Sequence, residues 1–160
     1  MLRKAVILIR EMSEIWKKSH NISILIYHYV CPAKYRKVVF DKDVDRVLKR
    51  TCLEIEKRHE VKFLETGTDK DHVHFLIQSV PIYSAKKVIQ LVKSITAREI
   101  FRQNPEVKKE LWGGEFWTDG YYVSTVGQRG GEETIRKYVQ EQGKETDYEQ
   151  IYTDMQLKLF

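Results

Sequence analysis

The stretch VKFLETGTDKDHVHFLIQSV, residues 61–80, decides the fold of this 160-residue chain. Alternating side chains over residues 61–66 predict one β-strand, and the apolar run over residues 73–80 predicts a second. The polar segment 67–70 contains a glycine and is typical of a turn between them. The sequence therefore predicts a β-hairpin that ends before Pro81.

A helix is predicted on each side of this hairpin. Before it, Asp41 is a candidate N-cap, and apolar residues at helical spacing continue to about Arg58. After it, Ser84 is a candidate N-cap for a second helix, which should end at Asn104 and Pro105. The two apolar stripes consist of Val44, Val47, Leu48, Leu53 and Ile55, and of Val88, Leu91, Val92, Ile95 and Ile100.

Two further strands complete the pattern. The run NISILIYHY, residues 21–29, is too short for a buried helix and predicts a central strand. The run FWTDGYYVST, residues 116–125, has the aromatic and β-branched content of one or two short strands. The order β-α-β-β-α-β predicts an α+β, ferredoxin-like fold, an antiparallel sheet with helices on one face. An additional C-terminal helix is predicted over residues 134–142, before Gly143.

This pattern sets the expected domain organisation. Residues 20–143 form the predicted domain, residues 1–19 are a helix-prone or loosely packed lead-in, and residues 144–160 are a polar tail. With 42% hydrophobic and 32% charged residues, the chain has the composition of a globular protein rather than a disordered one.

Cysteine content and hydropathy indicate the cellular location. Cys31 and Cys52 are too few for a disulfide framework, which favours a reducing, cytoplasmic location. No apolar stretch approaches the roughly 18 residues that a membrane-spanning helix needs, so we expect neither a signal peptide nor a membrane anchor.

The net charge of +5 is unevenly distributed. Basic residues outnumber acidic ones by 6 in residues 1–60 and by 3 in residues 61–110, whereas acidic residues prevail by 4 in residues 111–160. A basic excess in the first two thirds is compatible with nucleic-acid binding, and equally with an ordinary solubility surplus.

The most specific local motif is Asp71-His72-Val73-His74. Residues i and i+2 of a strand share one face, so His72 and His74 should project together. Two neutral imidazoles can hold one divalent metal ion and leave positions for substrate oxygen atoms. Histidines on a half-exposed strand also occur without any function, so the motif alone leaves both interpretations open.

A second candidate lies in the predicted C-terminal helix. Tyr138 and Gln142 are four residues apart and share a helix face. A phenol can attack phosphorus, and an amide oxygen is a hard metal ligand. Together with Ile135 and Val139 the two residues also fit an ordinary amphipathic stripe.

The combination and order of these segments resemble a known family. DHVHFL at 71–76, a Ser-capped helix, GYYVSTVG at 120–127 and IRKYVQEQ at 135–142 resemble the TnpA-type single-tyrosine transposases of small prokaryotic insertion sequences, members of the HUH endonuclease superfamily. IYHYVCPAKYRKVV at 26–39 resembles that family's first strand and basic connection. The resemblance extends from about His20 to Gly143.

The resemblance implies a role for each matching residue. His72 and His74 would bind Mg²⁺ or Mn²⁺, Gln142 would be a further ligand, and Tyr138 would be the nucleophile. Asp69 corresponds to a position where some members carry an acidic group near the metal. Asp71, next to His72, is expected to orient the hairpin or a histidine.

The resemblance also implies a substrate and a partner. The expected reaction cleaves and rejoins single-stranded DNA at hairpin-bearing element ends through a 5′-phosphotyrosine, within a homodimer. Glycines that follow the last strand would allow the tyrosine helix to swing, although they also fit a plain loop. Candidate DNA-binding residues, which also fit a solvated basic face, are Lys34, Tyr35, Arg36, Lys37, Arg46, Lys49 and Arg50; the hinge glycines are Gly127, Gly130 and Gly131.

Three alternatives remain from the sequence. One is a noncatalytic ferredoxin-like nucleic-acid-binding module, although the chain has no Arg/Lys-Gly-Phe-Gly-Phe strand of the RNA-recognition type. Another is a domesticated relative that cleaves chromosomal palindromic repeats. The third is a structural metal-binding domain, for which no set of four ligands is evident.

Overall fold

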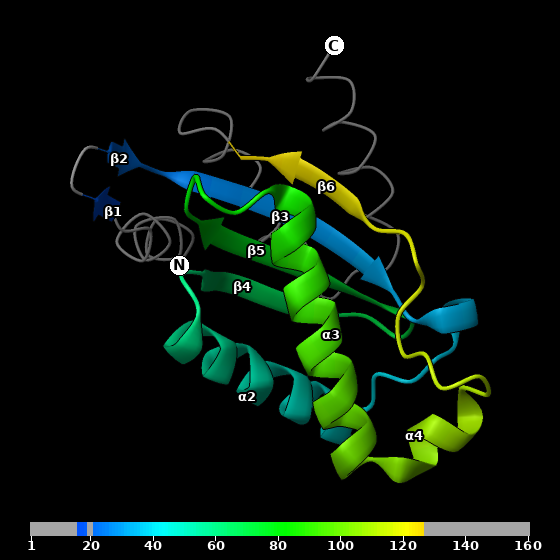
Figure 1. The fold of residues 1–160 in the computed structure, drawn as a ribbon. Coiled ribbons are helices and arrows are strands. Elements are labelled where there is room, and N and C mark those ends of the chain that lie inside the picture. Colours follow the sequence, from blue (N-terminus) through cyan, green and yellow to red (C-terminus); the bar gives the residue numbers. More distant parts are fainter. Residues whose placement is uncertain (1–15, 19–20, 127–160) are drawn as a thin grey trace, which may run out of the picture. The chain divides into compact units, whose positions relative to one another are not determined.

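The structure is a computed structural model that describes residues 16–18 and 21–126 (Figure 1). Residues Ile15–Thr125 form one compact unit. Its elements are β1 (Trp16–Lys18), β2 (Asn21–Ser23), β3 (Leu25–Pro32), the 3-10 helix η1 (Lys34–Arg36), α2 (Lys42–Arg58), β4 (Lys62–Thr68), β5 (His72–Ser79), α3 (Ala85–Gln103), α4 (Pro105–Glu110) and β6 (Tyr122–Thr125).

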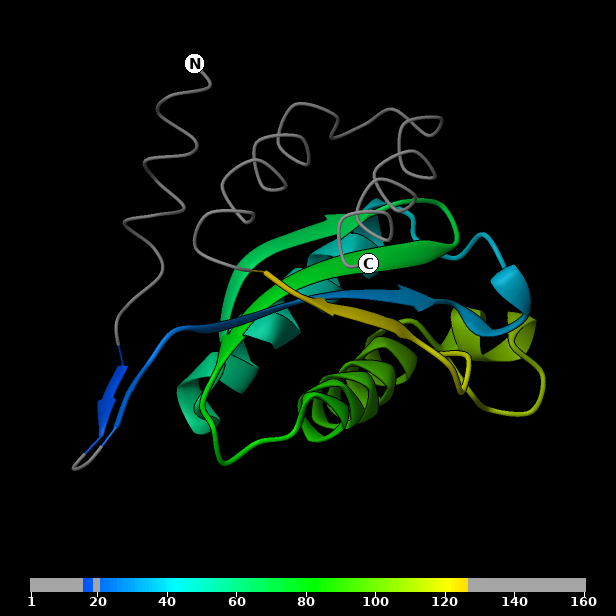
Figure 2. The same cartoon turned by 90° about the horizontal axis from the view of Figure 1, so that it is seen from above.

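The main sheet confirms the predicted fold class. Its four strands lie in the order β4-β5-β3-β6, and every neighbouring pair is antiparallel. Taken along the chain, β3-α2-β4-β5-α3-β6 is the ferredoxin-like arrangement. Helices α2 and α3 cover the same face of this sheet (Figures 1 and 2). The predicted helix over residues 134–142 lies outside the described residues.

The core fills the space between the sheet and these two helices. Alternate residues of β3 and β5 supply the sheet side, among them Tyr29, Phe75 and Ile77, which are fully buried. Helix α2 contributes Val44, Leu48 and Ile55, and helix α3 contributes Val88, Ile89, Val92 and Ile100. The side chains of β3 and β5 that alternate with Tyr29, Phe75 and Ile77 therefore lie on the opposite face of the sheet.

Both predicted N-caps are confirmed. The Asp41 carboxylate accepts hydrogen bonds from the backbone N–H groups of Asp43 and Val44, at 3.0 and 2.8 Å. The Ser84 hydroxyl accepts one from the N–H of Lys87 at 3.1 Å. Each cap satisfies N–H groups that have no partner within the helix, which fixes where the helix begins.

Removing the Asp41 cap should destabilise the protein. We expect Asp41→Ala to lower the free energy of unfolding by about 1 kcal/mol, because two N–H groups of α2 lose their acceptor. Urea denaturation followed by circular dichroism measures this change. Asp41→Asn retains an acceptor oxygen and serves as the matched control. Equal unfolding midpoints for the alanine variant and the wild type would contradict this assignment.

The first predicted strand is wrong in its bounds. Residues 21–29 do not form one strand; they are divided between β2 and β3, and β3 continues to Pro32. The extension is due to long-range pairing, since Pro32 lies opposite His72 of β5. Residues 16–18 belong to the lead-in that was expected to be helix-prone or loosely packed; they form the strand β1, which pairs with β2.

Two further differences follow α3. The helix ends at Gln103 as expected, but Pro105 begins another helix, α4, because a first-turn residue needs no N–H partner. The strand expected within residues 116–125 is limited to β6 at Tyr122–Thr125. Phe116 and Trp117 are instead buried in the core, and Trp117 forms an isolated β-bridge with Ala33.

Both cysteines, Cys31 and Cys52, are buried as free thiols. Burial raises the pKa of Cys31 to about 12, so this thiol stays protonated near neutral pH. In the part of the chain that the structure describes, no helix is long and apolar enough to cross a bilayer.

Candidate active site

Strand β5 places His72 and His74 side by side. Their ring centroids are 5.1 Å apart, and the side chains project from the sheet face that α2 and α3 do not cover. Val73 and Phe75, which alternate with them, are fully buried in the core beneath the helices. Core packing of β5 thus fixes the direction in which both imidazoles point.

A third histidine, which the sequence analysis did not identify, joins this pair. Nε2 of His28, on β3, lies 3.2 Å from Nδ1 of His74, and the two rings are stacked with centroids 5.5 Å apart. The alternation of side chains along IYHY, residues 26–29, places His28 on the sheet face opposite that of Tyr27 and Tyr29. Its proximity to His74 depends on the register of β3 against β5, in which Val30 lies opposite His74.

Asp71 holds the other histidine. Nδ1 of His72 donates to Oδ1 of Asp71 at 2.7 Å, and Nε of Arg36 donates to Oδ2 of the same carboxylate at 2.8 Å. Burial alone would raise the pKa of Asp71, but these two hydrogen bonds outweigh it and the pKa is lowered. Asp71 is therefore a charged acceptor near neutral pH, as the expected orienting role requires.

The two imidazoles fit a divalent metal ion. Each Nδ1 is engaged, by Asp71 in His72 and by His28 in His74, so Nε2 is the atom that would ligate in both rings. Ligating histidines commonly have such a partner on the second nitrogen, which fixes the ring and its tautomer. A neutral His74 that ligates through Nε2 would donate from Nδ1 to Nε2 of His28.

The protonation state suits metal binding as well. Burial, and the neighbouring His28 and His72, lower the pKa of His74 well below its ordinary value. Burial lowers the pKa of His28 to about 4. His74 and His28 are thus both neutral near pH 7, and for His74 this is the form of imidazole that binds a metal.

The remaining predicted metal ligands are placed only in part. Oδ2 of Asp69 lies 3.9 Å from Nε2 of His72, and its Oδ1 accepts from the N–H of Lys70 at 2.7 Å. Gln142 lies outside the described residues, as does Tyr138. Within residues 16–18 and 21–126, no cluster of three His, Cys, Asp or Glu side chains forms a metal-binding group. The hinge residues Gly127, Gly130 and Gly131 also lie beyond the described part.

The candidate DNA-binding residues fall into two groups. Those on α2 have partners along the helix or on α3: Arg46 binds Asp43, Lys49 binds Asp45, and Arg50 donates to Gln103. Helix α2 covers the opposite sheet face, so these three residues are not brought to the histidines.

The second group, at η1, lies close to the histidine pair. Arg36 reaches it through Asp71, while Lys34 binds Glu115 at 2.5 Å. Lys37 is exposed, as is the ring of Tyr35. Position alone therefore favours the η1 residues over the α2 residues for contact with a strand bound at the histidines.

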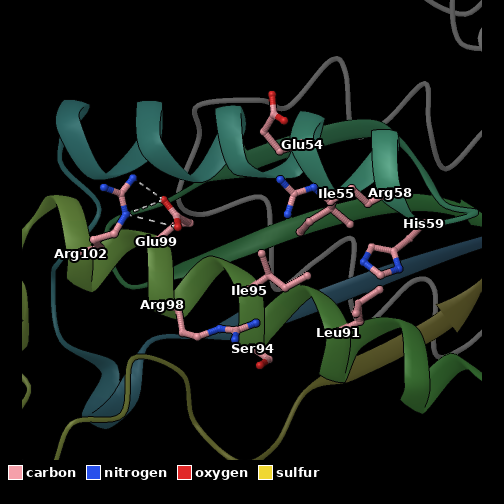
Figure 3. A pocket seen from close by; sticks show the side chains of 10 residues that line it. All are labelled: Glu54, Ile55, Arg58, His59, Leu91, Ser94, Ile95, Arg98, Glu99 and Arg102. Carbon is pink, nitrogen blue, oxygen red and sulfur yellow. Dashed lines mark hydrogen bonds and ion pairs between the residues drawn. The ribbon is translucent and has the colours of Figure 1, made fainter.

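A pocket of about 670 Å³ lies elsewhere, between α2 and α3 (Figure 3). Its lining includes Arg58, Arg98 and an ion pair between Arg102 and Glu99 at 2.9 Å. No site residue predicted from the sequence lines it. Since the helices cover the face opposite the histidine pair, this pocket is separate from the candidate active site.

Comparison with known proteins assigns the arrangement to a family. Residues 21–142 match the family model described as transposase IS200 like. The ISDra2 transposase TnpA of Deinococcus radiodurans is 30% identical over 118 residues, which cover 74% of this chain and 84% of that protein. The transposase for insertion sequence element IS200 of Salmonella typhimurium is 29% identical over 119 residues, covering 74% and 77% of the two chains.

A solved structure supports the fold. A crystal structure from Deinococcus radiodurans R1, described as that of a candidate transposase, superposes with a TM-score of 0.65 and 27% sequence identity. The match covers 79% of this chain and 97% of that one. Sequence and fold therefore lead to the same group of proteins.

Proposed function

This chain belongs to the IS200-like transposase family, a family of DNA-processing enzymes, and from that premise we propose that it cleaves and rejoins single-stranded DNA at the ends of an insertion element. The observation that carries the proposal is the buried pair His72 and His74, each held through Nδ1 by its own partner. Such an arrangement has the form of a metal-binding half-site rather than of two chance histidines.

The proposed site has a defined set of ligands. His72 and His74 would hold Mg²⁺ or Mn²⁺ through their Nε2 atoms, with Gln142 and Asp69 as further oxygen ligands. The bound ion would supply positive charge and polarisation at a nonbridging oxygen of the scissile phosphate. Asp71 and His28 position the two rings, and the nitrogen ligands favour Mn²⁺ over Mg²⁺.

Tyr138 is the proposed nucleophile. Its phenol oxygen forms a bond to phosphorus as the bond from phosphorus to the 3′-oxygen breaks. One DNA end is then a 5′-phosphotyrosine and the other a free 3′-hydroxyl. Because a phosphate ester is exchanged for another phosphate ester, rejoining by a 3′-hydroxyl requires no nucleotide cofactor.

The proposed partners are hairpin-bearing single strands at element ends and a second copy of the chain. The short edge strand β6 supports the second proposal, because no strand of the described residues pairs with its outer side. Gly127, Gly130 and Gly131 would form the hinge through which the Tyr138 helix is placed. We also propose a cytoplasmic location, which fits the two free thiols of Cys31 and Cys52.

A covalent-adduct assay tests the proposed reaction. The full-length protein is incubated with single-stranded element-end DNA and Mn²⁺, and products are separated on a denaturing gel. We expect a protein–DNA adduct that EDTA abolishes and that duplex DNA of the same sequence does not yield. An adduct of equal yield with duplex DNA, or in EDTA, would overturn the proposed mechanism.

A further inference from the structure

Two exposed aromatic rings lie stacked at one end of the sheet. The rings of Tyr35 and Trp112 are 5.4 Å apart, with 15° between their planes, and the residues are 49% and 72% exposed. Tyr35 covers one face of the indole, so the exposure of Trp112 leaves its other face to solvent. We refer to this pair as the aromatic platform.

Two segments distant in sequence build the platform and are bonded to each other. Tyr35 lies in η1, and the N–H of its neighbour Lys34 donates to the carbonyl of Phe116 at 2.8 Å. Trp112 follows Leu111, which is fully buried. Backbone and core packing therefore hold both rings in place before any ligand arrives, which lowers the entropy cost of binding.

The backbone at the platform is unusual. Tyr35 and Arg36 have φ values of 59° and 54°, in the left-handed region of the backbone that residues other than glycine rarely adopt. After Trp112, Gly113 and Gly114 have φ values of 100° and 74°, which glycine tolerates. Left-handed non-glycine residues occur preferentially at binding and catalytic sites, where the surrounding structure maintains them.

The platform is connected to the histidine pair. Arg36, adjacent to Tyr35, donates to Asp71 at 2.8 Å, and Asp71 accepts from His72 at 2.7 Å. One side chain and one carboxylate thus separate the turn that carries Tyr35 from a proposed metal ligand. The turn that carries Tyr35 is therefore two hydrogen bonds away from His72.

We propose that the aromatic platform binds an unpaired base of the single-stranded substrate by stacking on Trp112. The inference rests on the proposed function, and it adds a recognition site for the strand beside the site of cleavage. Aromatic faces bind bases of any identity in this way, whereas duplex DNA keeps its bases stacked internally. Arg36 and Lys37 follow Tyr35 in the chain and are exposed, so they add positive charge next to the platform for the phosphates of the strand.

A base fits the platform better than a protein partner does. Two rings bury far less than the roughly 1,200 Å² of a stable protein interface. Lys34, whose Nζ lies 5.8 Å from the centre of the Tyr35 ring, adds positive charge next to the rings, although Glu115 binds it. The chemistry is that of a stacking site bordered by cations.

The test compares a strand that has bases with one that lacks them. Fluorescence anisotropy measures binding of a labelled thymidine oligonucleotide of about 20 nucleotides, and of an abasic strand of the same length, in EDTA. We expect the wild type to prefer the thymidine strand by about tenfold, and Trp112→Ala to reduce this preference to about twofold or less. Trp112→Phe keeps an aromatic face and should retain most of the preference.

The controls separate the possible failures. Ile82→Ala removes another exposed apolar side chain, on a residue that is 76% exposed, and should leave the preference unchanged. Thermal unfolding of each variant confirms that it is folded. If the wild type binds both strands equally, or binds neither, the platform is wrong, while the adduct assay with element-end DNA tests the proposed function separately. If the wild type prefers the thymidine strand and Trp112→Ala keeps that preference, the platform alone is wrong.

Discussion

Tyr138→Phe should abolish the covalent adduct with single-stranded DNA, a loss of at least about a thousandfold. Phenylalanine keeps the aromatic ring but lacks the oxygen that would attack phosphorus. Noncovalent binding of the same strand should persist, because the variant removes no basic residue and no ring. Denaturing gels measure the adduct, and anisotropy measures the binding.

A second tyrosine controls for a wrong choice of nucleophile. Tyr148 lies ten residues further along the chain, so Tyr148→Phe matches the change in chemistry at a nearby position. This variant should form the adduct at the wild-type level. An adduct formed by Tyr138→Phe and lost in Tyr148→Phe would transfer the role to Tyr148. Mass spectrometry of the nuclease-trimmed adduct assigns the modified peptide independently.

The second large effect is expected at the histidine pair. His72→Ala and His74→Ala should each reduce adduct formation below detection, about a thousandfold or more, because the proposed metal site loses one of its two nitrogen ligands. Adding Mn²⁺ should not restore either variant. His59→Ala is the matched control, since His59 lines the pocket between α2 and α3 on the other side of the sheet.

The positioning residues should behave differently from the ligands. His28→Ala and Asp71→Ala leave both proposed ligating nitrogens in place but remove the partners of Nδ1. We expect each to raise the Mn²⁺ concentration for half-maximal adduct by about 10- to 100-fold, with activity recovered at saturating Mn²⁺. A positioning role would be contradicted if these variants needed no more Mn²⁺ than the wild type. It would also be contradicted if saturating Mn²⁺ did not restore adduct formation.

Local sequence patterns predicted the parts of the fold that depend on neighbouring residues. Asp41 and Ser84 mark the helix starts because a cap bonds N–H groups within its own helix. His72 and His74 share a face because alternation is a property of any strand. The element order then limited the topology to a form that the structure confirms.

The parts that sequence could not supply depend on contacts between distant segments. His28 reaches His74 only because β3 pairs with β5 in one particular register. Trp112 meets Tyr35 only because the segment after α4 is bonded to η1. The length of β3 also depends on such contacts, since hydrogen bonds to β5 rather than local propensity extend it to Pro32.

Strand β5 carries both histidines and lies inside the sheet, with β4 on one side and β3 on the other. All eight of its residues are buried. Local opening of a protein usually releases edge strands, loops and termini, while a doubly paired interior strand exchanges its amide hydrogens only through unfolding of the whole unit. The histidine pair therefore has no separate melting step, and heat should disorder it only when the sheet itself is lost.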